Sequence, residues 1–145
     1  LSAPYWEPEA KAAIIGMTPH TTKAHIVRAA LESIAYRVRD VLSLMVKDAG
    51  VEMQFIHADG GAVKNQFLMQ FIADMLGITV RASSLPELSA LGAVFSGLLG
   101  MRVVNGLEDL QALSMKSVDY EPLMDSLTAD KFYKGWLDAV QRTLH

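Results

Sequence analysis

Short apolar segments alternate with helical ones in the middle of the chain, and glycines mark the junctions. Residues 53–58 form the kind of apolar run that is typical of a buried strand, and residues 62 or 63 to 76 return to the spacing of an amphipathic helix. The pattern then repeats as a strand over residues 78–82 and a helix over residues 88–99. Strands that are joined through one helix pair in parallel by right-handed crossovers. This order predicts an α/β fold with parallel strands and packed helices.

A long helix precedes this alternation, and two further helices follow it. Thr21 or Thr22 can cap the long helix, which should end near Gly50. Its apolar residues recur every three or four positions, as in an amphipathic helix. They are Ile26, Ala30, Ile34, Val38, Val41 and Met45. Toward the end of the chain, the spacing predicts a short helix over residues 107–113, a connecting segment, and a last amphipathic helix over residues 128–144.

Two strands are too few for so many helices, because each strand has two faces and two edges to cover. The first residues, Leu1–Pro8, contain neither an initiator methionine nor the basic and apolar regions of a signal peptide. We therefore expect a fragment or an excised domain that is missing its first strands. If the chain folds alone, it should cover its exposed sheet edge by pairing with a second copy, as a homodimer, or by exchanging an element with it.

Composition indicates one compact domain and disfavours several partners. The chain has 145 residues, of which 51% are apolar, and this is enough for one hydrophobic core. A net charge of −3 without clustered Lys or Arg disfavours nucleic acid and anionic membranes as partners. No segment approaches the roughly 20 apolar residues of a membrane helix. The lack of cysteine excludes disulfides and thiolate metal sites and fits a cytoplasmic protein.

The turn after the first strand is the best candidate for a binding site. Within Phe55–Asn65, Gly60 and Gly61 permit positive φ angles and close backbone approach, and the next helix offers unpaired N–H groups and a positive dipole end. A nucleotide phosphate suits this combination. Asn65, in the first helical turn, can reach a base, ribose or phosphate, and Lys64 can add charge. A plain turn without a ligand is the alternative, because Gly-Gly often has no other purpose.

The other ionisable residues are weaker candidates, and we predict no catalytic and no metal-binding residue in this chain. Asp59 is expected to cap the turn rather than act as a base. Glu32 and Glu87 are typical of carboxylates on a helix surface and at a helix end. The histidines lack the spacing of a metal site. They are His20, His25, His57 and His145.

Two further groups of side chains have a structural and a functional interpretation. Tyr5 and Trp6 lie in a loop with two prolines, where we expect them to pack on their own domain, with the lining of a cleft as the alternative. Arg37 and Arg39 are typical of a solvated or ion-paired helix face, with phosphate binding as the alternative.

Two separated blocks resemble the second signature of the FGGY carbohydrate kinases. Residues 12–17 read Ala-Ala-Ile-Ile-Gly-Met, and seven residues later residues 25–32 read His-Ile-Val-Arg-Ala-Ala-Leu-Glu. Further segments are similar to the glycerol kinases of this family in particular. These segments are 3–8, 36–42, 59–63 with Asn65, 67–71 and 88–93. The resemblance is close over residues 3–106 and looser in the last helix, around Gly135 and Trp136.

The resemblance implies a two-domain enzyme of the actin-like ATPase superfamily, whose ribonuclease-H-like domains close around ATP and a polyol. This chain would form most of the C-terminal domain. Gly61 and Asn65 match the positions that contact the adenine nucleotide in this family, and Gly60 is the neighbouring candidate. The catalytic Asp, the polyol-binding residues and the phosphate-binding hairpins would lie upstream of Leu1. The chain alone should then be inert, and it should not ligate the Mg²⁺ that accompanies ATP or ADP.

Alternatives stay open for the substrate and for the class of protein. Xylulose and gluconate kinases share the signature, so glycerol rests on the flanking similarity alone. A free-standing module that binds a nucleotide or a partner without catalysis is the competing class. The chain departs from many relatives at Glu7-Pro8 and at residues 10–12. Residues 122–128 lie near the segment with which some bacterial glycerol kinases bind a regulator, but they match it poorly, and we do not transfer that partner.

Overall fold

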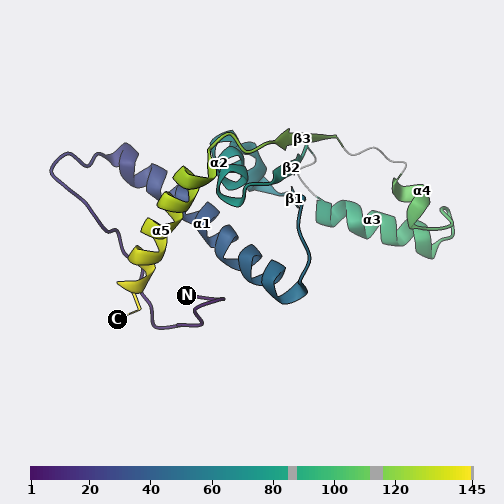
Figure 1. Ribbon diagram of the computed structural model, residues 1–145. Coiled ribbons are helices and arrows are strands. Elements are labelled where there is room, and N and C mark those ends of the chain that lie inside the picture. The colour runs from purple at the N-terminus through teal and green to yellow at the C-terminus, as the bar shows by residue number, and fades with distance from the viewer. Residues whose placement is uncertain (85–87, 112–115, 145) are drawn as a thin grey trace.

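A small mixed sheet and five α-helices make up the described part of the chain (Figure 1). The computed structural model describes residues 1–84, 88–111 and 116–144. Strand β1 (Phe55–Ala58) pairs in parallel with β2 (Thr79–Ser83), with Ala58 opposite Ala82. The α/β class and the parallel pair are therefore confirmed. Because the strand order is β1-β2-β3, strand β1 forms one edge of the sheet.

The third strand, β3 (Ser117–Tyr120), pairs antiparallel with β2 and was not predicted. These residues were predicted to be part of a connecting segment, because four residues with two polar side chains carry little periodic signal. Their conformation depends on a distant partner. Val118 lies opposite Ala82, and Tyr120 lies opposite Val80. The sheet is therefore mixed rather than purely parallel.

Helix α1 (Lys23–Ala49) has the predicted limits. It begins after Thr22, whose backbone N–H donates to Nδ1 of His25 at 3.1 Å in a capping box. It ends at Gly50, whose φ of 63° lies in the left-handed region that favours glycine at this position. Both ends of the longest helix thus follow from local sequence.

Helix α2 (Gln66–Leu76) begins later than predicted. The predicted start at residue 62 or 63 is wrong, because Gly61–Lys64 form a separate 3-10 turn, η1, and Asn65 is the N-cap of α2. Most of the hydrophobic core comes from α2, β2 and small residues of the neighbouring helices. The buried core residues are Ala35, Leu68, Met69, Phe71, Ile72, Ala73, Met75, Val80, Ala82 and Ala129.

The apolar residues that recur along α1 are not buried in the core. Among the described residues of this helix, only Ala35 and Asp40 are buried. Ile34 is 47% exposed and Met45 is 54% exposed. The helical period was predicted correctly, but much of the apolar surface that it creates has no cover in this chain.

The remaining helices lie at opposite ends of the molecule in Figure 1. Helix α5 (Ser126–Gln141) crosses α1 and begins at Asp125, whose side chain accepts the backbone N–H of Thr128 at 2.9 Å. Helices α3 (Leu88–Gly100) and α4 (Leu107–Gln111) extend away from the sheet on the other side. None of the described side chains of α3 is buried. Over the described residues, no helix has the length and apolar character needed to cross a membrane.

Candidate functional site

The glycine turn lies at the carboxyl ends of β1 and β2. The two strands run parallel, so Ala58 at the end of β1 and Ser83 at the end of β2 lie on the same side of the sheet, where the carboxyl ends of both strands meet. In open α/β sheets, ligands bind in the crevice outside the carboxyl ends of the strands. Gly60 has φ 83° and ψ −170°, a conformation that L-residues with a side chain rarely adopt. Gly61 starts η1 without a positive φ.

A small hollow of about 230 Å³ opens beside this turn. One wall comes from the turn and the start of α2, and the other comes from the end of β2 and from β3. The lining residues are Gly60, Val63, Lys64, Gln66, Ala82, Ser83, Ser84, Val118 and Tyr120. Of the predicted residues, Gly60 and Lys64 therefore line the hollow directly. Gly61 and Asn65 adjoin it in the chain but do not line it.

Asn65 has two structural roles at the start of α2. Its Oδ1 accepts the backbone N–H of Leu68 at 3.0 Å, which caps the helix. Its own backbone N–H closes η1 by donating to the carbonyl oxygen of Ala62 at 3.0 Å. Asn65 is thus the N-cap rather than a first-turn residue. With Oδ1 held by the cap, the Nδ2 amide is the part of the side chain that a ligand could use.

The start of α2 also supplies backbone donors. The first hydrogen bond of this helix runs from the N–H of Met69 to the carbonyl oxygen of Asn65 at 3.1 Å. The N–H groups of Gln66 and Phe67 precede it and have no acceptor within the helix. Together with the helix dipole and the nearby Lys64, they make this end of α2 suitable for an anion.

Asp59 does not cap the turn as predicted. The N-cap position of η1 is Gly60, and no side chain caps that turn. The exposed carboxylate of Asp59 instead lies at the border of a larger apolar groove on the other side of the turn. The turn therefore separates a small, partly polar hollow from a large apolar one.

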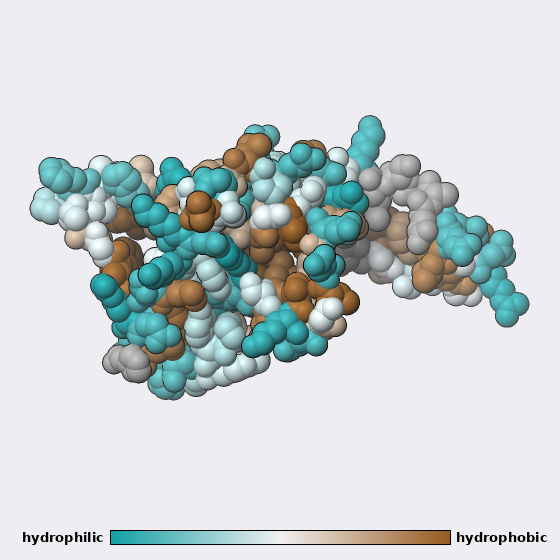
Figure 2. All heavy atoms as spheres, viewed as in Figure 1, coloured by the Kyte–Doolittle hydropathy of each residue, from teal (hydrophilic) through white to brown (hydrophobic). Residues whose placement is uncertain are grey.

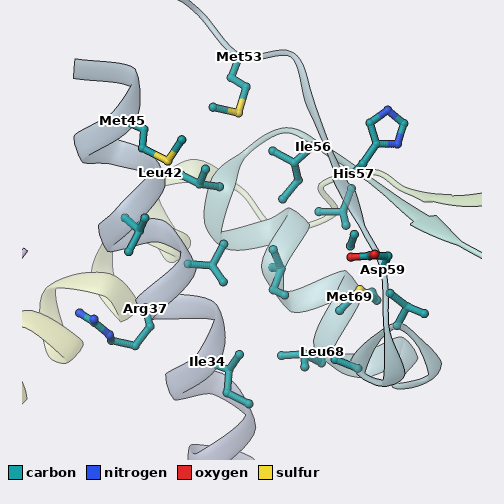
Figure 3. Close-up of a pocket in the computed structure, with 17 residues that line it drawn as sticks. Ile34, Arg37, Leu42, Met45, Met53, Ile56, His57, Asp59, Leu68 and Met69 are labelled. Carbon is teal, nitrogen blue, oxygen red and sulfur yellow. The ribbon is translucent and has the colours of Figure 1, made fainter. Parts of the chain in front are cut away.

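The apolar groove has a volume of about 830 Å³ and lies between α1 and the β1 edge. Figure 3 shows Met45, Met53 and Ile56 turned toward the space between these elements, whereas the ring of His57 points away. Figure 2 shows further apolar side chains at the surface of the molecule. The groove is where the exposed Ile34 and Met45 of α1 lie. Its lining is mostly apolar, with Arg37, His57 and Asp59 as the ionisable residues.

The predicted charged residues of α1 form ion pairs. Glu32 accepts from Arg28 at 2.6 Å, and Arg39 pairs with Asp130 at 2.5 Å. Arg37 pairs with Asp40 at 3.1 Å. The ion-paired interpretation of the arginines is thus confirmed. Glu87 lies outside the described residues, and over the part of the chain that is described, no group of three or more His, Cys, Asp or Glu side chains is placed to hold a metal ion.

Asp40 is a buried acid that joins distant segments, and it was not among the residues predicted from the sequence. Asp40 is 4% exposed and accepts hydrogen bonds from the N-terminal loop and from α5. Tyr5 of that loop packs on its own domain as predicted, while Trp6 is 74% exposed. The one available signal was an acidic residue between Val38 and Val41 of the predicted helix, which does not identify its partners.

Comparisons of the sequence and of the structure with known proteins all point to the same protein family. The family model of the FGGY family of carbohydrate kinases, C-terminal domain, matches residues 1–101. The chain is 46% identical over 143 residues to a glycerol kinase of Pseudomonas fluorescens (strain Pf0-1) and to one of Roseiflexus sp. (strain RS-1). Each match covers 99% of this chain but only 29% of the relative.

Solved structures of this family share the fold. A glycerol kinase of Plasmodium falciparum, in a crystal structure with ADP, superposes with a TM-score of 0.88 at 34% identity and covers 99% of this chain and 29% of its own. A xylulose kinase of Lactobacillus acidophilus superposes with a TM-score of 0.79 at 21% identity over 97% of this chain and 29% of its own, which is evidence for the fold alone. A partial ribonuclease-H-like domain, as found in the actin-like ATPase superfamily, fits the small mixed sheet with its packed helices.

Proposed function

Because the chain belongs to the FGGY family of carbohydrate kinases and matches their C-terminal part, we propose that it is the nucleotide-binding part of an ATP-dependent glycerol kinase. The complete enzyme would convert ATP and glycerol to ADP and glycerol 3-phosphate. The observation that carries this proposal is the 46% identity to glycerol kinases over 99% of the chain. The chain spans about 29% of the length of these relatives, so the remaining parts of the site would come from elsewhere.

The nucleotide would bind at the turn between β1 and α2. Gly60 gives the turn its shape, and the absence of a side chain at Gly61 would let the ligand approach the backbone closely. Space around Gly61 is open, since a Cβ built there meets no heavy atom within 4 Å. The Nδ2 of Asn65, oriented by the cap on Leu68, would donate to the nucleotide. The structure with ADP of a similar glycerol kinase supports a nucleotide as the ligand.

The chemistry would depend on groups outside this chain. Phosphoryl transfer needs positioned phosphates, a metal ion and an oriented acceptor hydroxyl. The Mg²⁺ that accompanies ATP would be held by the nucleotide phosphates and by residues outside this chain. We expect the isolated chain to bind nucleotide weakly and to phosphorylate nothing.

Glycerol is the substrate that the sequence matches favour within the family. Among the solved structures, the glycerol kinase shares 34% identity with this chain, whereas the xylulose and gluconate kinases share 20–26%. Residues that recognise the polyol would lie outside this chain, so the choice of glycerol over these sugars rests on overall similarity.

A titration of the ¹⁵N-labelled chain with ADP, followed by NMR, tests the nucleotide site. The amides of Gly60, Gly61 and Asn65 should shift at millimolar ADP, and Gly61→Ala should abolish the shifts by adding a methyl group at the proposed contact. Gly97→Ala is a matched control, because Gly97 also has open space and no positive φ but lies in α3. Unchanged spectra at millimolar ADP, or equal loss in both variants, would contradict the site.

The apolar groove favours a second candidate, an assembly module without catalysis. Strand β1 lies at the edge of the sheet, and the groove beside it is lined by exposed apolar side chains of α1. Such an edge can pair with a strand of another molecule. Under this candidate, the chain would show no response to ADP in the titration above, whereas the nucleotide-binding proposal requires the amide shifts.

A further inference from the structure

Asp40 is a buried carboxylate that the proposed nucleotide site does not use. Its side chain is 1% exposed and lies on the side of α1 that faces both the N-terminal loop and α5. A charge in this environment costs free energy unless hydrogen bonds and an opposite charge compensate it. The buried charge of Asp40 therefore favours the arrangement in which the neighbouring segments supply these hydrogen-bond donors and the positive charge.

Four side chains donate to the two oxygens of Asp40. Oδ1 accepts the hydroxyl of Tyr133 at 2.6 Å. Oδ2 accepts Nε1–H of Trp136 at 3.1 Å, Nη1–H of Arg37 at 3.1 Å and the hydroxyl of Tyr5 at 3.3 Å. Tyr5 belongs to the N-terminal loop, Arg37 to α1, and the other two to α5. One carboxylate thus holds three segments that are separated by up to 96 residues in sequence.

Arg37 extends the same connection into the N-terminal loop. Its Nη2 donates to the carbonyl oxygen of Ala3 at 2.7 Å and to Oγ of Ser2 at 3.0 Å. Its guanidinium also lies over the ring of Tyr5, 5.5 Å from the centroid. The loop is therefore held by Asp40 and by the residue that neutralises Asp40.

Helix α5 also contacts α1 through side chains that are neighbours of Asp40 or its hydrogen-bond partners. The ring of Trp136 stacks on Tyr36 with centroids 5.6 Å apart, and the guanidinium of Arg39 lies 4.2 Å from the centroid of the Tyr133 ring. Burial, followed by the hydrogen bond to Asp40, raises the pKa of Tyr133. Burial, followed by the charge of Asp40, also raises the pKa of Tyr5. Both phenols therefore stay protonated and remain donors to the carboxylate.

We propose that Asp40 acts as a shared anchor that couples the N-terminal loop to helix α5, so that releasing one segment loosens the other. Hydrogen bonds that converge on one group influence each other, and removing one donor leaves the buried charge less compensated for the rest. A displacement of the loop would therefore be transmitted to α5, although Tyr5 and Tyr133 donate to different oxygens of the carboxylate. This inference does not depend on nucleotide binding.

A double-mutant cycle with Tyr5→Phe and Tyr133→Phe tests the coupling in the whole 145-residue chain. Each substitution removes one hydroxyl and keeps the ring, so both variants should fold. If the two hydroxyls share one network, their effects on the unfolding equilibrium should deviate from additivity by roughly threefold or more. Asp40→Asn keeps the size of the side chain and should remove this coupling in the same cycle. If the unfolding equilibrium constant of the double mutant changes by the product of the two single-mutant changes, within measurement error, the two hydroxyls are independent and the proposal is overturned.

A local measurement in α5 gives an independent readout. In a Trp6→Phe background, Trp136 is the remaining tryptophan, so its quenching by acrylamide reports on α5 alone. Tyr5→Phe should increase the quenching of Trp136. It should also speed amide exchange over residues 126–141 at least roughly twofold more than the loss of global stability alone would do. Tyr120→Phe, which removes a tyrosine hydroxyl from β3, is the matched control and should change neither. Equal responses to both substitutions would refute the coupling.

Discussion

At the scale of single residues, two adjacent glycines have different physical roles. Gly60 has φ 83°, whereas Gly61 has no positive φ, and both have open space where a Cβ would lie. The Gly-Gly pair predicted the turn and its place between strand and helix. It did not show which glycine adopts the positive φ, because that depends on how η1 joins the end of β1.

Gly60→Ala should destabilise the chain by about 1–3 kcal/mol, because φ 83° combined with ψ −170° is a backbone conformation that is essentially restricted to glycine. Gly61→Ala should have a much smaller effect, since neither φ nor packing opposes a methyl group there. The difference between the two variants in the free energy of urea unfolding measures the conformational term alone. Equal destabilisation would mean that the turn does not have this geometry.

The buried Asp40 marks the limit of sequence-based prediction at this scale. Its hydrogen-bond partners lie 35, 93 and 96 residues away, apart from Arg37 in the preceding turn. Loop packing of Tyr5 and ion pairing of Arg37 were predicted separately, and both are confirmed. Their meeting at one carboxylate depends on where α5 crosses α1, and local patterns do not encode that crossing.

At the scale of secondary structure, the strength of the local signals explains which boundaries were predicted. Helix α1 ends at the expected glycine because Gly50 adopts the left-handed C-cap conformation. The start of α2 was placed too early because the apolar period does not distinguish a 3-10 turn from the first turn of an α-helix. Strand β3 was missed because its conformation depends on pairing with β2, which lies more than 30 residues earlier.

The cap of α2 allows the structural and ligand roles of Asn65 to be separated. Asn65→Ala should cost about 1 kcal/mol of stability, because the N–H of Leu68 loses its acceptor. Asn65→Asp should retain the cap, since a carboxylate accepts the same hydrogen bond and suits the helix dipole. It should nevertheless weaken ADP binding, because it replaces a donor by a negative charge. Urea unfolding and ADP titration of both variants check this, and normal ADP binding by Asn65→Asp would exclude the Nδ2 contact.

The cap of α5 predicts a dependence of stability on pH. Hydrogen bonds from Thr128 lower the pKa of Asp125 below its ordinary value of 3.8. Since the folded-state pKa is the lower one, the carboxylate contributes stability above pH 3.8, and this stability is lost as the pH falls through the lowered value. Asp125→Asn keeps an acceptor but does not titrate. Relative to this variant, the natural chain should lose stability in acid, as measured by urea midpoints, and parallel pH profiles would contradict the assignment.

At the scale of the whole molecule, much apolar surface is left uncovered. The apolar face of α1 borders the open groove, β1 has an unpaired edge, and α3 has no buried side chain among its described residues. The sequence already indicated too few strands for these helices. The chain spans about 29% of its relatives' length, and in a longer protein other segments could cover this apolar surface.

The uncovered groove predicts self-association of the chain at high concentration. Pairing of two β1 edges would extend the sheet and bury apolar side chains of both copies, so the mass measured by light scattering should rise with concentration. Met45→Gln should shift this equilibrium toward the monomer, because Met45 lines the groove and is 54% exposed. Leu123→Gln, at a residue that is 81% exposed and does not line the groove, should leave it unchanged. A monomer at every concentration, or an equal effect of both substitutions, would show that the β1 edge does not mediate assembly.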